Sequence, residues 1–474
     1  MAGTTNIPMG LLMIASGFGL LRATDFPSPD DGEEGDAVGA MIATEEPGAP
    51  TAWTTAVEPK PLSEEVKQGL AWLLRHQLES GGWGQGEEAP GMRASGKEGQ
   101  GRANVADTCM AALAILRAGG SPEAGEYAEP LQRAVAFVCG EVEEADDESL
   151  WVTSIRGTRV QGKIGTYVDT FLASMLLSEV QGAMGDPGRD VRVERALARV
   201  LDKIERHQNE SGTWSGSGWA PVLSQSLAVK GINRAVQRGL VVSESSLRKA
   251  EEYFGNTAYV ADYSVAAGVP LYALSAQVGA LQESANTDRI EEVELQEELA
   301  VAEDDAARAS IAQDLRRIEA SRGVQAQVQE SLLGRLDDPS FVAGFGSNGG
   351  EEFLSYMNIS ESLVLRADDE WRRWDAAMTA NLSRVQNEDG SWTGHHCITG
   401  RTFCTATALL VLTADRTPVP VEAITAVEPG PEKPEPFDCG GVVQPEPLPQ
   451  VFEGGGVLPL VSEPGPSDCP GMLR

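Results

Sequence analysis

The chain is poor in basic residues and in histidine. Its 474 residues include 37 Lys and Arg against 71 Asp and Glu, with 4 His, and the formal net charge is −34. A surface this negative repels phosphate backbones and anionic headgroups. The composition therefore argues against a nucleic-acid partner. Three stretches of about −7 each, residues 1–60, 283–335 and 415–474, carry most of the excess charge.

Cysteine is also scarce, and its spacing fits no compact disulfide framework. Of the six cysteines, Cys109, Cys139 and Cys404 fall within apolar, helix-like stretches, where a buried thiol is ordinary. Cys439 and Cys469 lie near the end of the sequence and are able to pair. Cysteine usage therefore leaves the compartment open.

Long hydrophobic runs are missing. The stretch "IPMGLLMIASGFGLL" (7–21) is too short to span a bilayer comfortably and suits the core of a signal peptide, although no Lys or Arg precedes it. Export, a cytoplasmic location and membrane association all stay open.

Residues 1–60 and 415–474 combine Pro, Gly and acids with too few apolar residues to offset the entropy of ordering. We expect both to be disordered, which leaves 61–414 as the folded region.

A seven-residue motif occurs three times, as "QLESGGW" (77–83), "QNESGTW" (208–214) and "QNEDGSW" (386–392). Four fixed residue types in seven positions form a specific repeat signal. Each copy follows an amphipathic stretch with helical periodicity, and Gly or Asn in the motif tolerates the left-handed conformation that ends a helix. The motif's first and last positions are occupied by Gln77, Trp83, Gln208, Trp214, Gln386 and Trp392.

Between the copies the same alternation of a longer polar helix and a smoother apolar helix recurs, which predicts six helix pairs in all. An extra segment, residues 284–330, is charged and free of proline, with Ile311, Leu315 and Ile318 at helical spacing. It predicts a solvated helical hairpin that turns near Asp304 and Asp305. Two roles stay open for it, a structural one and that of a docking arm.

These units resemble the QW repeat of squalene-hopene and oxidosqualene cyclases and the related repeats of protein prenyltransferase β subunits. The resemblance covers about 62–414. It implies an all-α fold, an (α/α)6 toroid in which outer helices end at the repeats and inner helices line a central cavity. In such a ring the repeat Gln bonds backbone groups at a neighbouring helix end and the Trp packs under the next hairpin, so both have structural roles.

The resemblance implies two chemistries. The cyclases protonate an alkene with Asp-x-Asp-Asp, and this chain has no such string; the nearest is "EADD" (144–147), in an acidic loop. The prenyltransferases hold a substrate thiolate on zinc with an Asp-x-Cys pair and a His that enters an inner helix. Here "DTC" (107–109) lies in the first repeat, whereas the family's pair comes from a later one, and Cys404 is near the position of the family's His.

If six hairpins close into a ring, the last inner helix lies beside the first. Asp107, Cys109 and Cys404 then meet at one mouth of the cavity, with one or more of His395, His396 and Cys397. Zinc accepts such mixtures of Cys, His and Asp, so zinc is the expected metal. Two alternatives stay open for "GHHCITGR": a Cys397–Cys404 disulfide, and plain packing of small side chains.

A second group of candidates lies at the expected starts of inner helices. Glu351 and Glu352 open one such helix after a glycine-rich stretch, either as catalytic carboxylates or as ordinary helix-capping acids. Asp169 and Asp262 are further candidate catalytic carboxylates. Aromatic and amide side chains there suit ligand binding in an isoprenoid cavity, through ring quadrupoles and polar contacts, although aromatic stripes are also common in helix cores. The ligand-binding candidates are Asn348, Tyr356, Asn358, Tyr167, Tyr259 and Tyr263.

Two functions follow. The first is an isoprenoid-handling enzyme, cyclase-like or prenyltransferase-like, with an apolar cavity and metal or acid chemistry at its mouth. The second is a non-catalytic toroid that binds an apolar ligand, or a partner protein through its acidic insertion or tail. The concentration of Cys, His and Asp at one expected edge favours the first. The missing Asp-x-Asp-Asp string and the incomplete zinc set favour the second.

Overall fold

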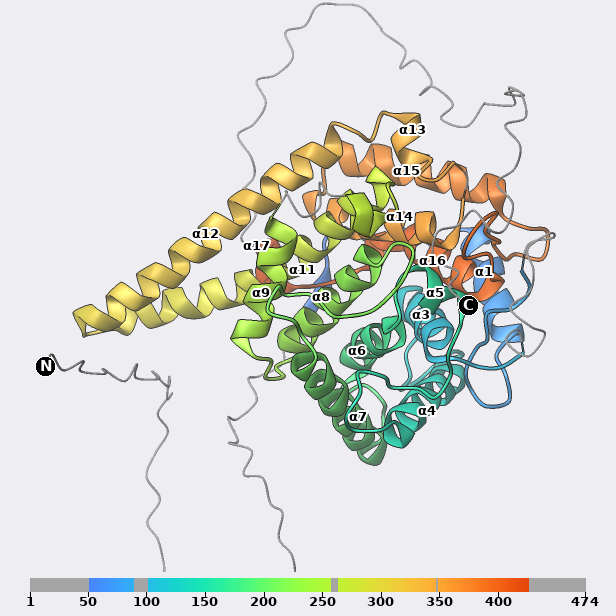
Figure 1. Cartoon of the computed structure of the whole chain (residues 1–474), viewed down its shortest axis with the longest axis horizontal. Helices are drawn as coiled ribbons and strands as arrows, with labels where there is room; N and C mark the ends of the chain where they lie inside the picture. The colour runs from blue at the N-terminus through green and yellow to red at the C-terminus, as the bar shows by residue number, and fades with distance from the viewer. Residues whose placement is uncertain (1–50, 89–100, 257–262, 347, 426–474) are drawn as a thin grey trace, which may run out of the picture. The chain divides into compact units, whose positions relative to one another are not determined.

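The computed structural model describes residues 51–88, 101–256, 263–346 and 348–425, and this part of the chain is mostly helical (Figure 1). The expected signal-like stretch 7–21 and most of the two expected disordered segments lie outside these residues, as do Cys439 and Cys469. Among the described helices, none combines the length and the apolar character needed to cross a membrane.

Six helices, one of them over its first half only, bury side chains on nearly all faces, because these sequences are rich in small and apolar residues. Each contacts the next one along the chain, and the last contacts the first. They are α3 (Val105–Arg117), α6 (Val168–Val180), α8 (Val222–Gln237), α11 (Pro270–Val301), α14 (Gly350–Leu363) and α16 (Arg401–Leu412). We call these the inner helices.

Six further helices pack one apolar face against the inner helices and leave the other face polar. In α7, for example, Val193, Leu197, Val200 and Ile204 are buried at helical spacing. Each of these outer helices precedes one inner helix in the chain, which gives the six expected pairs within the described residues. The outer helices are α1 (Glu64–Arg75), α4 (Ala128–Glu144), α7 (Pro187–Arg206), α9 (Glu244–Gly255), α12 (Asp305–Leu333) and α15 (Asp369–Val385).

The acidic insertion lengthens two of these helices instead of forming a separate hairpin. From Ala280 to Val301 the sequence has neither proline nor glycine, so α11 continues without interruption into the insertion. The chain turns before Asp304, whose side chain caps α12, and α12 returns alongside α11. The two helices extend together away from the other helices, in yellow in Figure 1, with a small core of Leu295, Ile311 and Ile318 between them.

The described chain extends beyond the expected folded region at both ends. Strand β1 (Trp53–Thr55) pairs antiparallel with β2 (Pro418–Pro420), which lies beyond the expected boundary at residue 414. A short helix, α17 (Val421–Thr425), follows β2 and packs on α11. The shorter elements are α5 (Arg159–Lys163), η1 (Tyr263–Ala266), α13 (Pro339–Val342), η2 (Val364–Arg366) and η3 (Ala414–Arg416).

The three sequence repeats have the same geometry. In each, the Gln side-chain amide donates to the carbonyl of the repeat glycine and to a carbonyl in the first turn of another outer helix. The indole N–H of each Trp donates to a carbonyl near the end of the preceding outer helix, at 2.7–2.9 Å. Gln77 and Gln208 reach the next outer helix along the chain, α4 and α9. Gln386 reaches Glu65 of α1, so the last repeat is fastened to the first helix.

Candidate functional site

The first turn of inner helix α14 carries two adjacent glutamates in a tightly packed place. Gly349 is the N-cap, and Glu351 and Glu352 are both fully buried. A Cβ on Gly349 would lie 2.8 Å from Cε1 of His396, so glycine permits the approach of the loop that precedes α16. The backbone of this loop is held beside α14 by the bond from Gly350 N–H to the Ile398 carbonyl, 3.0 Å.

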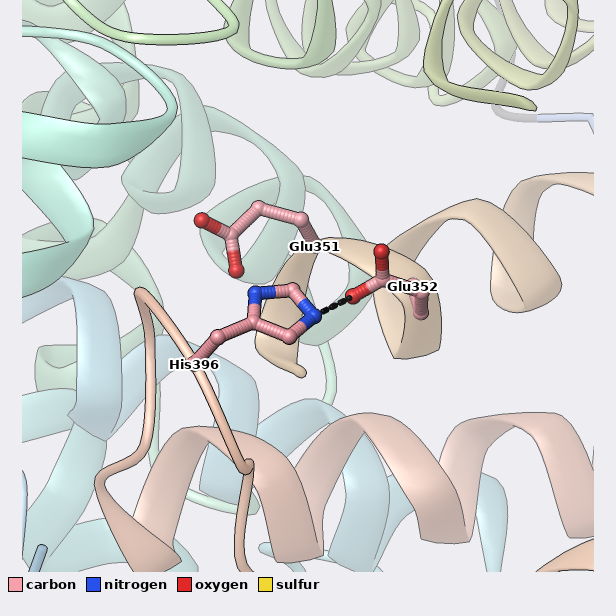
Figure 2. Close-up of side chains that lie close together, drawn as sticks. All are labelled: Glu351, Glu352 and His396. Carbon is pink, nitrogen blue, oxygen red and sulfur yellow. Dashed lines mark ion pairs between the residues drawn. The ribbon is translucent and has the colours of Figure 1, made fainter. Parts of the chain in front are cut away.

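His396 comes from that loop and lies between the two carboxylates (Figure 2). Its Nε2 is 3.2 Å from Oε2 of Glu352, and its other ring nitrogen faces Glu351. One ligand atom from each of the three residues lies within 4.8 Å of the others. The imidazole is 16 % exposed, whereas both carboxylates are sealed from solvent. Among the described residues, these three side chains lie close enough together to serve as ligands of one metal ion.

The two carboxylates are supported unequally. Oε1 of Glu352 accepts hydrogen bonds from the Tyr272 hydroxyl and from the Phe345 N–H, the latter at 3.0 Å. Oε2 of Glu351 accepts one long bond from the Ile398 N–H, 3.3 Å. Oε1 of Glu351 is completely buried and has no hydrogen-bond partner among the residues that the structure describes. A buried carboxylate oxygen without a partner is costly, so this atom is suited to meet a group that the protein itself does not supply.

Burial and mutual proximity perturb the ionisation of the site. Burial, followed by the neighbouring Glu352 carboxylate, raises the pKa of Glu351 to about 7. Burial alone would lower the pKa of His396, but the Cys397 thiol and the Glu352 carboxylate reverse the effect and raise it to about 11. Burial, and then the charge of Glu352, also raises the pKa of Tyr272, which keeps its hydroxyl a donor. One imidazolium thus shares a dry site with two carboxyl groups.

Aromatic rings connect the site to solvent. Phe345 is 48 % exposed and makes edge contacts with His396 and with Trp219, with centroid distances of 5.3 and 5.1 Å. Trp219 in turn contacts Tyr272 at 5.8 Å. A row of contacting rings thus runs from the exposed Phe345 through Trp219 to Tyr272, whose hydroxyl bonds Glu352.

The residues expected to converge on a metal are placed differently. Asp107, Cys109 and Cys404 are fully buried in α3 and α16 and lie outside the group that is able to hold a metal, as do Cys397 and the exposed His395. Cys397 and Cys404 are free thiols, so the disulfide alternative is wrong for this structure. The sequence therefore predicted His396 and the two glutamates as separate candidates but did not predict that they lie together.

Asp107 and Asp169 form a second pair of buried carboxyls at neighbouring inner-helix starts. Asp169 accepts from the Ala106 N–H at 3.0 Å and from the Gln161 amide at 2.7 Å, while Asp107 accepts from the Asn104 amide. Burial raises the pKa of Asp107 to about 7 and that of Asp169 to about 6. The Ala106 bond joins α3 to α6 and gives Asp169 a structural role. The Asn104 bond lies within the N-cap of α3, and Oδ1 of Asp107 is buried with no hydrogen-bond partner among the described residues.

The remaining candidates divide between packing and the undescribed part of the chain. The Tyr356 hydroxyl donates to the Val342 carbonyl at 2.8 Å, and the Asn358 amide donates to Ser226 at 3.4 Å, both within the core. The Asn348 carbonyl accepts from the His395 N–H at 2.8 Å, and Tyr167 packs edge-on against Trp151. Tyr259 and Asp262 lie outside the described residues, as does the side chain of Tyr263.

Charged side chains bridge the space between the inner helices, a feature that the sequence analysis missed. Glu361 of α14 forms ion pairs with Lys230 of α8 and with Arg117 of α3, the latter at 3.6 Å, and Arg234 pairs with two further glutamates. The signal was Lys and Arg inside otherwise apolar stretches such as "SLAVKGINRAV" (226–236). The network contains Arg117, Lys230, Arg234, Glu179, Glu283 and Glu361.

Comparisons with known proteins add no family. No protein-family model and no curated protein matches the chain. A glycosidase variant among the solved structures aligns with 74 % of this chain and 96 % of its own, at 13 % identity and a TM-score of 0.28. A similarity at that score supports no argument about fold or function.

Proposed function

We propose that the chain is an (α/α)6 toroid of the QW-repeat kind, with a divalent-metal centre at one mouth of the ring. The toroid is supported by the closed series of contacts among the six inner helices and by the Gln386 bond that fastens the last repeat to α1. The repeat glutamines form equivalent bonds in all three copies, as the resemblance to cyclases and prenyltransferases leads one to expect.

The metal centre consists of Glu351, Glu352 and His396. The observation that carries it is the fully buried, unbonded Oε1 of Glu351 beside a second carboxylate and an imidazole. Oxygen and imidazole ligands suit zinc, and three protein ligands leave a position open. The two glutamates belong to the fifth inner helix and the histidine to the loop before the sixth. They thus come from later repeats than "DTC", as the metal ligands of the prenyltransferases do.

The proposed activity is on an isoprenoid or similarly apolar small molecule that approaches past Phe345 and Trp219. Zinc bound here would act as a Lewis acid or hold a thiolate. The protein's own contribution is to exclude water with the aromatic rings, to fix Glu352 through Tyr272 and Phe345, and to hold a proton on Glu351 or His396 until metal replaces it.

A non-catalytic binding toroid is the second candidate, and one observation favours it. The ion pairs of Glu361 with Lys230 and Arg117 cross between inner helices that are not neighbours in the ring, so polar side chains occupy interior space that a large apolar substrate would need. Such a toroid would use its mouth, or its acidic extension, to bind a partner.

Zinc titration by calorimetry of the full chain, purified without a His tag, tests the metal centre. Wild type is expected to bind about one zinc per chain, and Glu351→Gln and His396→Gln to lose binding by at least about tenfold. His395→Gln is the matched control, because His395 is the adjacent exposed histidine and should bind as wild type does. Equal loss in the control, or no zinc binding by folded wild type, would refute the site.

An incubation of zinc-loaded protein with a polyprenyl diphosphate and a small thiol separates the two functions. Transfer of the prenyl group to the thiol, detected by mass spectrometry and lost in Glu351→Gln, supports the enzyme. Zinc binding without conversion of this substrate supports the binding toroid.

A further inference from the structure

A separate cavity lies where the extended helices leave the body of the protein. Its volume is about 180 Å³, and its walls come from α11, α12, η2 and α17. Figure 1 labels three of these elements, α11, α12 and α17. The cavity is smaller than a site for a drug-sized ligand, so a ligand that fits it is small.

The lining is cationic in a strongly acidic protein. Arg289, Arg322 and Arg366 border the cavity. Their carboxylate partners are Glu292 for Arg289, Glu292 and Glu319 for Arg322, and Asp368 for Arg366, and none of these acids is part of the lining. A guanidinium has five N–H donors, and Arg289 makes one hydrogen bond, at 2.7 Å to Glu292, so donors remain for a ligand.

Side-chain amides continue the polar surface inward. Gln325 of α12 donates to Gln282 of α11 at 2.8 Å, and Gln282 donates to Asn286 at 3.0 Å. Gln282 and Asn286 are 8 % and 4 % exposed, so these amides are built into the wall. These bonds use the carbonyl oxygen of Asn286 and the amide N–H of Gln325, and within the described part of the chain they leave the amide N–H of Asn286 available to a ligand.

Asp288 is the one acid in the lining, and a cation offsets it. Arg317 of α12 is 3.5 Å from Asp288. Three arginines and one carboxylate therefore line the cavity, and each of the four has an ion-pair partner outside the lining. A second, very small cavity shares Gln282, Asn286 and Leu365 with the first. It is lined by Lys230, Glu283 and Glu361 of the buried charge network, so the cationic lining is confined to the first cavity.

We propose that this cavity binds a small oxyanion, a phosphate or a compact carboxylate, through Arg289, Arg322 and Arg366, with the amides of Gln282 and Asn286 at its inner end. Guanidinium groups bind both kinds of oxyanion with paired N–H donors. The site is independent of the proposed metal centre, since it shares no residue with it, and it places a ligand on the elements that join the acidic extension to the ring.

Calorimetric titration of the full chain with inorganic phosphate and, separately, with citrate tests the site, in a low-salt buffer with chelator present. Saturable binding of either anion is expected, and the tighter of the two identifies the preferred group. Arg289→Gln and Arg322→Gln should weaken it at least about tenfold, and Arg322→Lys, which keeps the charge but loses the planar fork, should weaken it less.

Arg316→Gln is the matched control, because Arg316 is an exposed arginine of α12 outside the cavity. It should bind as wild type does. The absence of saturable binding by folded wild type at millimolar anion would overturn the proposal. So would equal weakening in Arg316→Gln, which would show general charge attraction and no site.

Discussion

Gln386→Ala tests the bond that fastens the last repeat to the first helix. The side-chain amide of Gln386 donates to the carbonyls of Glu65 and Gly390, both at 2.9 Å. A hydrogen bond contributes about 1 kcal/mol net, so the loss of two predicts a decrease of about 2 kcal/mol in the free energy of unfolding. Gln77→Ala and Gln208→Ala remove equivalent pairs of bonds and should cost about as much.

The assay is guanidinium chloride unfolding followed by tryptophan fluorescence, since the repeat tryptophans are buried beside these bonds. Gln313→Ala is the control, because Gln313 is exposed on α12 and its loss should change the free energy of unfolding by less than about 0.5 kcal/mol. If Gln386→Ala behaves like Gln313→Ala while the other two repeat variants are destabilised, the last repeat does not hold α1 in solution. The reasoning about ring closure would then be wrong.

Three further changes probe the core. Gly212→Ala places a Cβ 1.9 Å from the Lys249 carbonyl at a φ of +80°, so it should destabilise the protein in the same unfolding assay, by more than Gly323→Ala at an open position. Glu361→Gln leaves Lys230 and Arg234 without that carboxylate and should cost about 3–5 kcal/mol, whereas an unchanged midpoint would mean that the network is not formed. The pKa of Asp107 is raised by burial from 3.8 to about 7, so its share of stability is highest at low pH and is lost as pH rises between these values, by roughly 4 kcal/mol. Asp107→Asn should remove that part of the pH dependence, and a dependence that persists unchanged would contradict the assignment.

The helix pairs and their order were predictable from the sequence, because amphipathic and smoothly apolar stretches alternate and the repeat marks where outer helices end. The acidic extension was predictable as helical, but its continuity with α11 was not. A separate hairpin was expected because the composition changes after residue 283, yet a change of composition breaks no helix without a proline or a glycine.

The site was predictable only in parts. His396 and the two glutamates were candidates because of their residue types and their positions at expected inner-helix starts. Their contact depends on α14 and α16 being neighbours and on Gly349 admitting the imidazole, and periodicity reveals neither. Tyr272 and Lys230 were missed because their partners, Glu352 and Glu361, lie on another helix. The sequence of one helix does not reveal which side chains of other helices it contacts.

Zinc-edge X-ray absorption of the natively purified full chain tests the central claim most directly. The proposed centre of Glu351, Glu352 and His396 predicts a bound zinc whose protein ligands are all oxygen and nitrogen, at about 2.0–2.2 Å. A sulfur shell at about 2.3 Å would instead show that zinc is bound by cysteines, as in the site expected from Asp107, Cys109 and Cys404. That result, or native protein that carries no zinc and takes up none, would contradict the account.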